Sequence, residues 1–177
     1  LTERWGQQVE IDNRAGGGRV IGASAVAPAA PDGHTLLLTN NTHFINPHLM
    51  ANLPYDALRD FTPVSTLATS AYLLLLKPSV PAQNLQEFLA YVKAHPGKVN
   101  FGTHGPGGLT HLAAELLNMT AGTRMQMVQY KGAGPALTGI LAGEVDVYLD
   151  APATTVPHVK SGKLRAIGIS GKTGLAS

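Results

Sequence analysis

Short apolar runs alternate with segments of helical periodicity along most of this chain, and this alternation restricts the fold more than any other feature. The apolar runs are nearly continuous, which is typical of strands that are covered on both faces. Strands that alternate with helices predict an α/β architecture with a largely parallel sheet. The predicted strands are 9–12, 34–39, 70–77, 99–103, 125–130, 145–150 and 164–170.

Helix signals fill the intervals between these strands. Asn84 and Glu87 form an Asn-x-x-Glu capping pattern ahead of apolar residues at helical spacing. Pro135 and Gly143 are placed as the first turn and the end of another helix require. The predicted helices are a short one at 20–30, one that Asn84 begins, and those at 109–117, 134–143 and 155–162.

A proline-rich stretch at 46–64 separates an N-terminal part from a more regular C-terminal part. This predicts two lobes. We expect residues 1–68 to form part of the first lobe and residues 69–177 to form the second lobe; the family resemblance described below implies that the latter also include the start of a crossover back to the first lobe.

Composition excludes several classes of protein. Thirteen Lys and Arg against eleven Asp and Glu give a net charge of +2, too small and too scattered for a nucleic-acid or anionic-membrane surface. The chain has no cysteine, which removes disulfides, thiolate metal sites and a cysteine nucleophile. No apolar run approaches the roughly 20 residues of a membrane span, so no membrane insertion is expected.

The segment FGTHGPGGLTHLAAELL, residues 101–117, places four glycines between a strand and a helix. A loop that follows a parallel strand lies at the carboxyl end of the sheet, where open α/β folds bind ligands. Glycines let main-chain N–H groups approach a ligand closely, and the positive end of the helix dipole favours an anion. The stretch is therefore predicted to be an anion-binding loop.

Similar junctions occur at YKGAGPAL, residues 130–137, and at NRAGGGRVIG, residues 13–22. The glycines at 16–22 are spaced G-x-G-x-x-x-G, one residue longer than the dinucleotide-binding fingerprint. A nucleotide-dependent α/β oxidoreductase that uses the loop Gly16–Gly22 is therefore the alternative function.

No catalytic or metal-binding pattern is visible. His43 and His48, and likewise His104 and His111, have spacings that match no standard zinc site. No Gly-x-Ser-x-Gly nucleophile elbow occurs. Asp150, at the end of a strand, could bind a ligand amine or water, or could equally cap the following loop. The residues therefore show no catalytic constellation, and no metal and no cofactor are predicted.

Several segments resemble one known family, and they follow one another in that family's order and spacing. They are WGQQVEIDNRAGGGRVIGASAVAPAAPDGHTLLL, THFINPHL, LPYDALRDFTPV, VNFGTHGPGGLTHLAAELL, VQYKGAGPALTGILAGEVDVYLD and VPHVKSGKLRAIGIS. The chain resembles, along essentially its whole length, the Bug-type solute receptors. These are the extracytoplasmic substrate-binding proteins of tripartite tricarboxylate transporters.

The resemblance implies a periplasmic-binding-protein-like (type II) Venus-flytrap fold, a periplasmic location and no catalysis. It implies two partners: a small organic carboxylate, held between the lobes partly through backbone amides and ordered water, and a membrane permease. Family members also have an N-terminal strand with a ligand-contacting loop and a C-terminal return segment, and the chain resembles a fragment without them. Whether such a fragment binds a ligand or associates with another chain stays open.

Carried over by position, the resemblance assigns ligand-binding roles to residues in four places. Where many relatives have Ser-Ser-Gly-x-Gly-Ser, this chain has Thr-His-Gly-Pro-Gly-Gly, so the identity of the ligand is not carried over. The assigned residues are Thr42 and His43; Thr103, His104, Gly105, Gly107, Gly108 and His111; Tyr130, Lys131 and Gly132; and Asp150.

Overall fold

The computed structural model describes residues 2–14 and 16–171. The chain divides into two compact units, Leu1–Pro63 and Val64–Ser177. The crossover expected after the strand at 164–170 lies outside the described residues. Among those that are described, no helix is both long and apolar enough to cross a bilayer.

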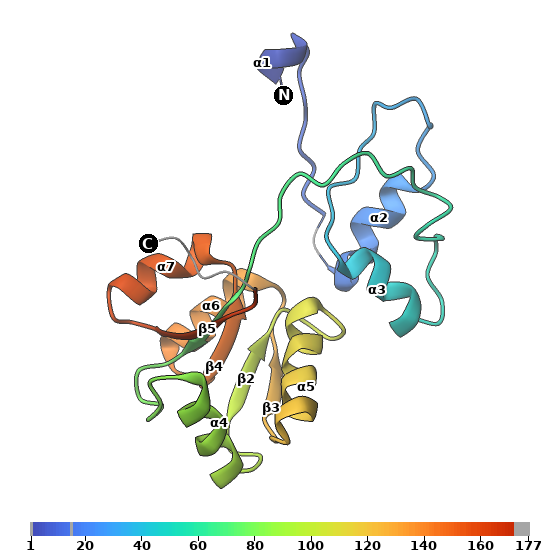
Figure 1. Ribbon diagram of the computed structural model, residues 1–177. Coiled ribbons are helices and arrows are strands. Elements are labelled where there is room, and N and C mark those ends of the chain that lie inside the picture. The colour runs from blue at the N-terminus through green and yellow to red at the C-terminus, as the bar shows by residue number, and fades with distance from the viewer. Residues whose placement is uncertain (1, 15, 172–177) are drawn as a thin grey trace. The chain divides into compact units, whose positions relative to one another are not determined.

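The second unit is built on one five-stranded sheet with the strand order β3-β2-β4-β1-β5 (Figure 1). Strand β2 pairs in parallel with both β3 and β4. Strand β1 is antiparallel to both of its neighbours, β4 and β5, so the sheet is mixed where a largely parallel one was predicted. The strands are β1 Leu73–Leu76, β2 Asn100–Thr103, β3 Gln126–Gln129, β4 Val147–Asp150 and β5 Arg165–Ile169.

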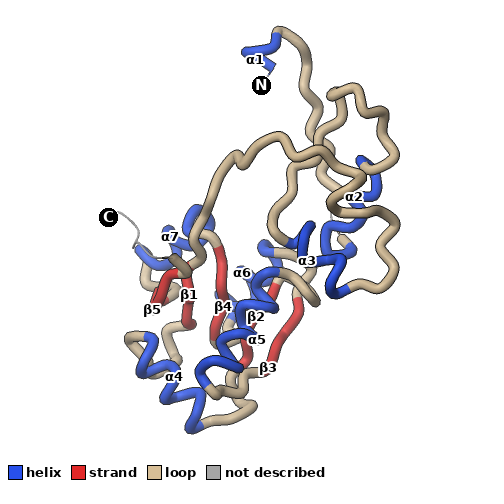
Figure 2. The backbone as a smooth tube through the Cα atoms, turned by 45° about the vertical axis from the view of Figure 1, so that its right-hand side comes forward, coloured by secondary structure: helices blue, strands red, loops and turns tan. Residues whose placement is uncertain are grey.

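Helices cover both faces of this sheet (Figure 2). Because successive side chains of a strand point to opposite faces, the four leucines of β1 divide between two cores. Leu74 and Leu76 pack with residues of helices α4 and α5, whereas Leu73 and Leu75 pack with residues of α6 and α7. The helices are α4 Leu85–Ala94, α5 Leu109–Ala121, α6 Ala133–Ala142 and α7 Pro152–Lys160.

The predicted helix signals of this unit are confirmed, with one shift. The side chain of Asn84 accepts a hydrogen bond from the Glu87 amide at 2.9 Å, as the capping pattern requires. Gly143 ends α6. Helix α7 begins at Pro152, three residues before the predicted start at 155, because proline is well suited to the first turn of a helix.

The first unit consists of helices and extended segments around a small core. Its helices are α1 Thr2–Trp5, a 3-10 turn at Gly17–Arg19, α2 Val20–Val26 and α3 Thr42–Leu49. Ala23, Tyr55 and Ala57 form the centre of the core. Helix α3 was missed by the sequence prediction, because Pro47 lies inside it and proline normally interrupts a helix.

Two strand predictions for this unit are wrong. Within residues 2–14 and 16–63 no strand forms, and neither 9–12 nor 34–39 pairs with another described segment. Their apolar side chains are largely exposed: Ile11 is 84 % exposed and Leu38 is 80 % exposed. An extended segment becomes a strand only when a neighbouring strand takes up its backbone hydrogen bonds, and the described residues supply none here.

Candidate functional site

Three strand-to-helix junctions meet at one edge of the second unit's sheet. Since β3, β2 and β4 are parallel and adjacent, their carboxyl ends lie side by side (Figure 1). The N-cap residues of the helices that follow are Gly108 for α5, Gly132 for α6 and Ala151 for α7. None of these three described N-caps makes a side-chain capping hydrogen bond. The first amides of each helix, which have no partner inside the helix, therefore point from the same edge.

The loop between β2 and α5 is held by its own helix. The His104 amide donates to Thr110 Oγ1 at 3.0 Å, and the Gly107 amide donates to His111 Nδ1 at 3.0 Å. Gly105 and Gly107 have φ angles of 129° and 67°, which favour glycine. The amides of His104, Gly107 and Gly108 are thus engaged within the loop, and the amides of the first turn of α5 have no partner inside the helix.

A buried polar network lies beside this loop, on β4. The Tyr148 hydroxyl lies 2.9 Å from Asp150 Oδ2 and 3.1 Å from the Ala133 carbonyl oxygen, and it can donate its proton to either. His104 Nε2 lies 2.8 Å from the same hydroxyl oxygen. Because the hydroxyl proton is directed to an acceptor, we infer that Nε2 carries a proton and donates to Tyr148.

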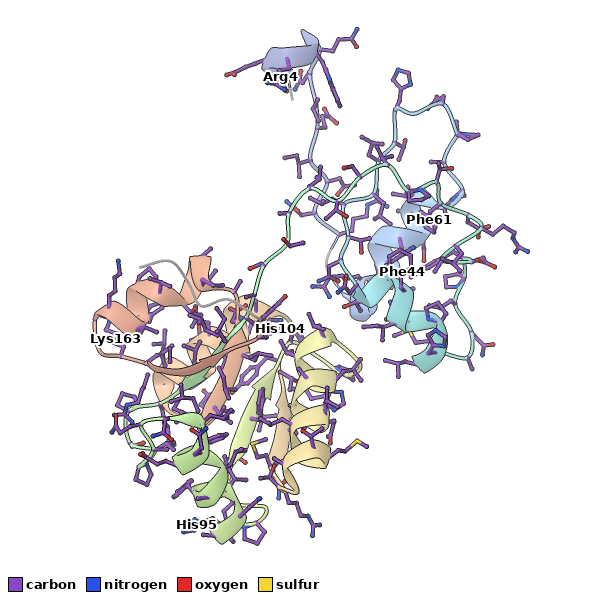
Figure 3. The ribbon with its side chains drawn as sticks, viewed as in Figure 1. Arg4, Phe44, Phe61, His95, His104 and Lys163 are labelled. Carbon is purple, nitrogen blue, oxygen red and sulfur yellow. The ribbon has the colours of Figure 1, made fainter. Side chains whose placement is uncertain are left out.

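The surroundings of Tyr148 keep its hydroxyl group protonated. Burial of the ring, and then the negative charge of Asp150, raise the pKa of the Tyr148 hydroxyl far above its usual range, so that it stays a donor. Asp150 is 4 % exposed, and its Oδ2 also accepts a hydrogen bond from Thr154 Oγ1 at 3.1 Å. His104 Nε2 lies 3.8 Å from Asp150 Oδ1. His104 and Asp150, predicted separately from the sequence, are therefore brought together through Tyr148 (Figure 3 labels His104 at this edge).

Thr103 carries an unusual hydroxyl at the end of β2. The residue is fully buried, and Oγ1 has no hydrogen-bond partner among the residues that the structure describes. A buried hydroxyl without a partner costs about 1–3 kcal/mol. The carbonyl oxygen of Thr103 accepts a hydrogen bond from the Tyr130 amide at 3.0 Å, which connects the ends of β2 and β3.

In the Tyr-Lys-Gly turn, the side chain of Tyr130 packs against helix α6. The Tyr130 hydroxyl donates to Glu144 Oε2 at 2.9 Å, and its ring packs so closely on Gly139 that a Cβ there would meet the hydroxyl oxygen. Burial, followed by the hydrogen bond to Glu144, raises the pKa of Tyr130. Lys131 is exposed, directly before the N-cap Gly132 of α6.

Thr42 and His43 lie in the core of the first unit. His43 is 4 % exposed, its Nε2 lies 3.0 Å from the Ala57 carbonyl oxygen, and its ring stacks on Tyr55. Thr42 Oγ1 accepts from Arg19 Nη1 at 3.2 Å. These contacts hold both side chains in the core, although Nδ1 of His43 has no hydrogen-bond partner among the described residues, and a contact with a ligand stays a prediction for them.

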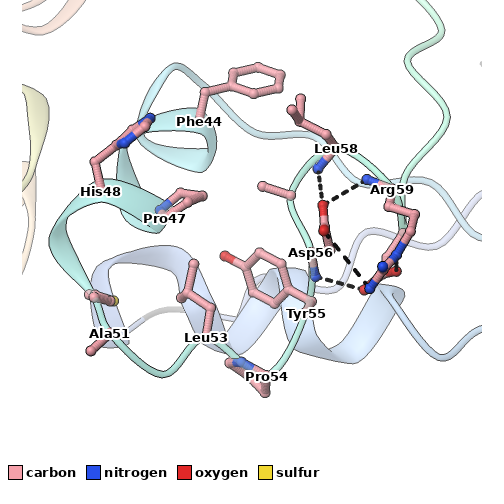
Figure 4. A pocket seen from close by; sticks show the side chains of 13 residues that line it. Phe44, Pro47, His48, Ala51, Leu53, Pro54, Tyr55, Asp56, Leu58 and Arg59 are labelled. Atoms are coloured by element: carbon pink, nitrogen blue, oxygen red, sulfur yellow. Dashed lines mark hydrogen bonds and ion pairs between the residues drawn. The ribbon is translucent and has the colours of Figure 1, made fainter.

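The first unit also has an open pocket of about 770 Å³ that includes none of the predicted residues (Figure 4). Tyr55 lies on its wall, and Asp56 holds its rim by accepting from the amides of Leu58 and Arg59. The residues that line it are Phe44, Pro47, His48, Met50, Ala51, Leu53, Pro54, Tyr55, Asp56, Ala57, Leu58, Arg59 and Asp60.

The alternative sites find no support in the structure. In the described part of the chain, no group of three or more His, Cys, Asp or Glu side chains is arranged to hold a metal ion. The loop Gly16–Gly22 follows an extended segment rather than a strand, so the strand-loop-helix unit of a dinucleotide-binding fold is not formed there.

Comparison with known proteins decides the family. The model of the tripartite tricarboxylate transporter family receptors matches residues 1–177. The chain belongs to this receptor family. It is 37 % identical over 171 residues to the protein BugT of Bordetella pertussis, covering 96 % of this chain and 52 % of BugT. The chain thus spans about half the length of this relative.

Solved structures of other proteins also match this chain. MatC from Rhodopseudomonas palustris with bound malate matches with a TM-score of 0.85 and 35 % identity, over 97 % of this chain and 58 % of MatC. The R. palustris protein Rpa4515 with adipate matches with a TM-score of 0.91 and 29 % identity, again over 97 % of this chain and 58 % of the other. The fold is that of the periplasmic binding proteins, of which this chain covers a little over half, as the sequence predicted.

Two features of the site were missed by sequence reasoning. Thr110 and Tyr148 were not among the predicted residues, yet each bonds to His104. Tyr148 could have been found, because residues two apart on a strand share a face and Tyr148 lies two residues before Asp150. Thr110 had no such signal, because its bond to the His104 amide depends on how the glycine loop folds back.

Proposed function

We propose that this chain is the ligand-binding part of a periplasmic receptor that captures a small organic carboxylate and delivers it to a membrane permease. The observation that carries the proposal is the meeting of three uncapped helix N-termini at adjacent strand ends. Backbone amides and helix dipoles directed at one place favour an anion. The malate bound by MatC and the adipate bound by Rpa4515 support a carboxylate as that anion.

Magnitudes indicate that the helix termini act together with other contacts. Each terminus contributes about 0.3–1 kcal/mol to an anion, so three contribute about 1–3 kcal/mol. A micromolar ligand requires about 8 kcal/mol. We infer that direct hydrogen bonds and the exclusion of water supply the rest, as closure about a hinge does in binding proteins of this kind. In this proposal residues 69–177 belong to the second lobe of a flytrap and residues 1–68 to the first.

Polar and charged side chains lie beside the helix N-termini at the carboxyl ends of the strands. Lys131 places an exposed ammonium group next to the start of α6, whereas Nε2 of His104 is engaged by Tyr148. The carboxyl group of Asp150 lies within hydrogen-bond distance of two hydroxyl groups, those of Tyr148 and Thr154, which can donate to it. The hydroxyl of Thr103, which has no hydrogen-bond partner among the described residues, is a further candidate for a ligand contact, because a ligand or an ordered water would remove the cost of leaving it unpaired.

Calorimetry on a receptor of full family length that carries this chain tests the proposal. The titrants are mono-, di- and tricarboxylates, with malate and adipate included. We expect at least one of them to bind with micromolar or tighter affinity, and uncharged amides of the same acids to give no heat. Absence of binding across the whole panel contradicts the proposal.

A further inference from the structure

The glycine loop between β2 and α5 is tied down by two side chains from the first turn of the helix that follows it. Thr110 Oγ1 accepts a hydrogen bond from the His104 amide, and His111 Nδ1 accepts one from the Gly107 amide, each at 3.0 Å. The N-cap itself, Gly108, has no side chain to offer. The usual arrangement, in which an N-cap side chain accepts from amides inside the helix, is therefore reversed: side chains inside the helix accept from amides outside it.

This reversal divides the backbone donors into two groups. The loop amides of His104 and Gly107 are satisfied by protein groups. The amides of the first turn of α5 have no intrahelical partner and are left for an anion. A loop that is held without using these amides can stay in place before a ligand arrives, which lowers the entropic cost of binding.

The contact with Gly107 sets the tautomer of His111. A backbone amide can only donate, so Nδ1 of His111 must accept and must carry no proton. The proton of the neutral ring is then on Nε2, which faces Glu115 Oε1 at 3.7 Å. Gly107 has a φ of 67°, a conformation that this contact holds at the point where the loop turns into the helix.

We propose that His111 is a positioning residue for carboxylate binding: its Nδ1 holds the Gly107 amide and thereby fixes the loop beside the ligand. The inference rests on the proposed function of this edge. It differs from the ligand contact predicted for His111 from the sequence, because the imidazole acts on the ligand only through the loop. Thr110 acts in the same way on the His104 amide.

Two substitutions separate the acceptor from the ring. In His111→Asn the side-chain oxygen can take the place of Nδ1, so the acceptor is kept while the ring is lost. In His111→Phe the ring is kept while the acceptor is lost. His95→Phe is the matched control, since His95 is an exposed residue at the far end of α4, away from the loop (Figure 3).

The test measures amide hydrogen exchange at Gly107 and malate affinity in the same receptor of full family length. We expect His111→Phe to exchange faster at Gly107 and to bind malate about 3- to 10-fold more weakly, the effect of losing one hydrogen bond. His111→Asn should restore most of both, and His95→Phe should change neither. Unchanged exchange of core amides such as that of Leu75 shows that the variants are folded.

Three results overturn the inference. They are unchanged exchange at Gly107 in His111→Phe, faster exchange there with unchanged malate affinity, and equal losses in the Asn and Phe variants. If the unsubstituted receptor binds neither malate nor any other carboxylate of the panel, the proposed function fails. Exchange at Gly107 then still decides whether His111 holds the loop.

Discussion

Two leucine runs in this chain differ in burial and in secondary structure. Leu73–Leu76 form the strand β1, and each of the four side chains is buried. In the run Leu36–Leu38 of the first unit, Leu36 and Leu38 are largely exposed, and Leu37 is partly buried against the small core. The residue types are the same, so the difference comes from neighbours: β1 has a strand on each side, whereas 34–39 pairs with none of the described residues. An apolar run determines that a segment can be a strand, and a partner determines whether it is one.

The largest expected effect tests this difference directly. Leu75 is fully buried between β4 and β5 of the second unit, so Leu75→Ala should lower the free energy of unfolding by about 2–5 kcal/mol. Leu38, which is 80 % exposed, is the matched control, and Leu38→Ala should change it by less than about 0.5 kcal/mol. Urea denaturation of the 177-residue chain measures both. A cost for Leu38→Ala equal to that of Leu75→Ala would break the comparison, because it would mean that Leu38 is covered.

Helix capping gives a second, smaller contrast between the units. Asn84 caps α4 by accepting from the Glu87 amide, so Asn84→Ala should destabilise the chain by about 0.5–2 kcal/mol. Asn41 occupies the N-cap of α3 but makes no such bond to a described residue. Asn41→Ala should therefore have little effect on the denaturation midpoint. Equal losses at the two positions would show that α3 is capped in solution.

For buried threonine hydroxyls, we expect the larger loss of stability in the first unit and not in the second. Thr42 of the first unit has a partner in Arg19, and Thr42→Val should cost about 1 kcal/mol. Thr103 of the second unit has none among the described residues, so Thr103→Val should be neutral or stabilising by up to about 1 kcal/mol. Thermal melting of both variants gives the comparison. A clear destabilisation by Thr103→Val would mean that the hydroxyl has a partner in the folded chain and is not kept for a ligand.

The fold of the second unit could be predicted well because its strands are apolar on both faces. The direction of β1 could not, since it depends on a long connection and not on the residues of the strand. In the first unit the pattern at 34–39 predicted a strand, but pairing depends on distant parts of a chain that local sequence does not reveal. Pro47 concealed helix α3.

For the site, the sequence identified the glycine loop and the strand-end acid but not what connects them. Gly105 and Gly107 do adopt conformations that favour glycine, which is the signal their spacing carries. The contact of His104 with Tyr148 joins residues 44 positions apart, and no local pattern gives such a distance. Likewise, the sequence suggested that loop amides would bind the ligand, whereas two of them are engaged by Thr110 and His111.

The central claim is that uncapped amides at the start of α5 bind the carboxylate, and a new cap tests it most directly. Gly108 has φ −69° and ψ 163°, which aspartate can adopt. In Gly108→Asp the carboxylate can cap these amides, so malate and adipate titrations should show at least a tenfold loss of affinity without a loss of thermal stability. Asn84→Asp, a cap exchange at α4, should leave the affinity unchanged. Undiminished carboxylate binding by a stably folded Gly108→Asp receptor would contradict the account.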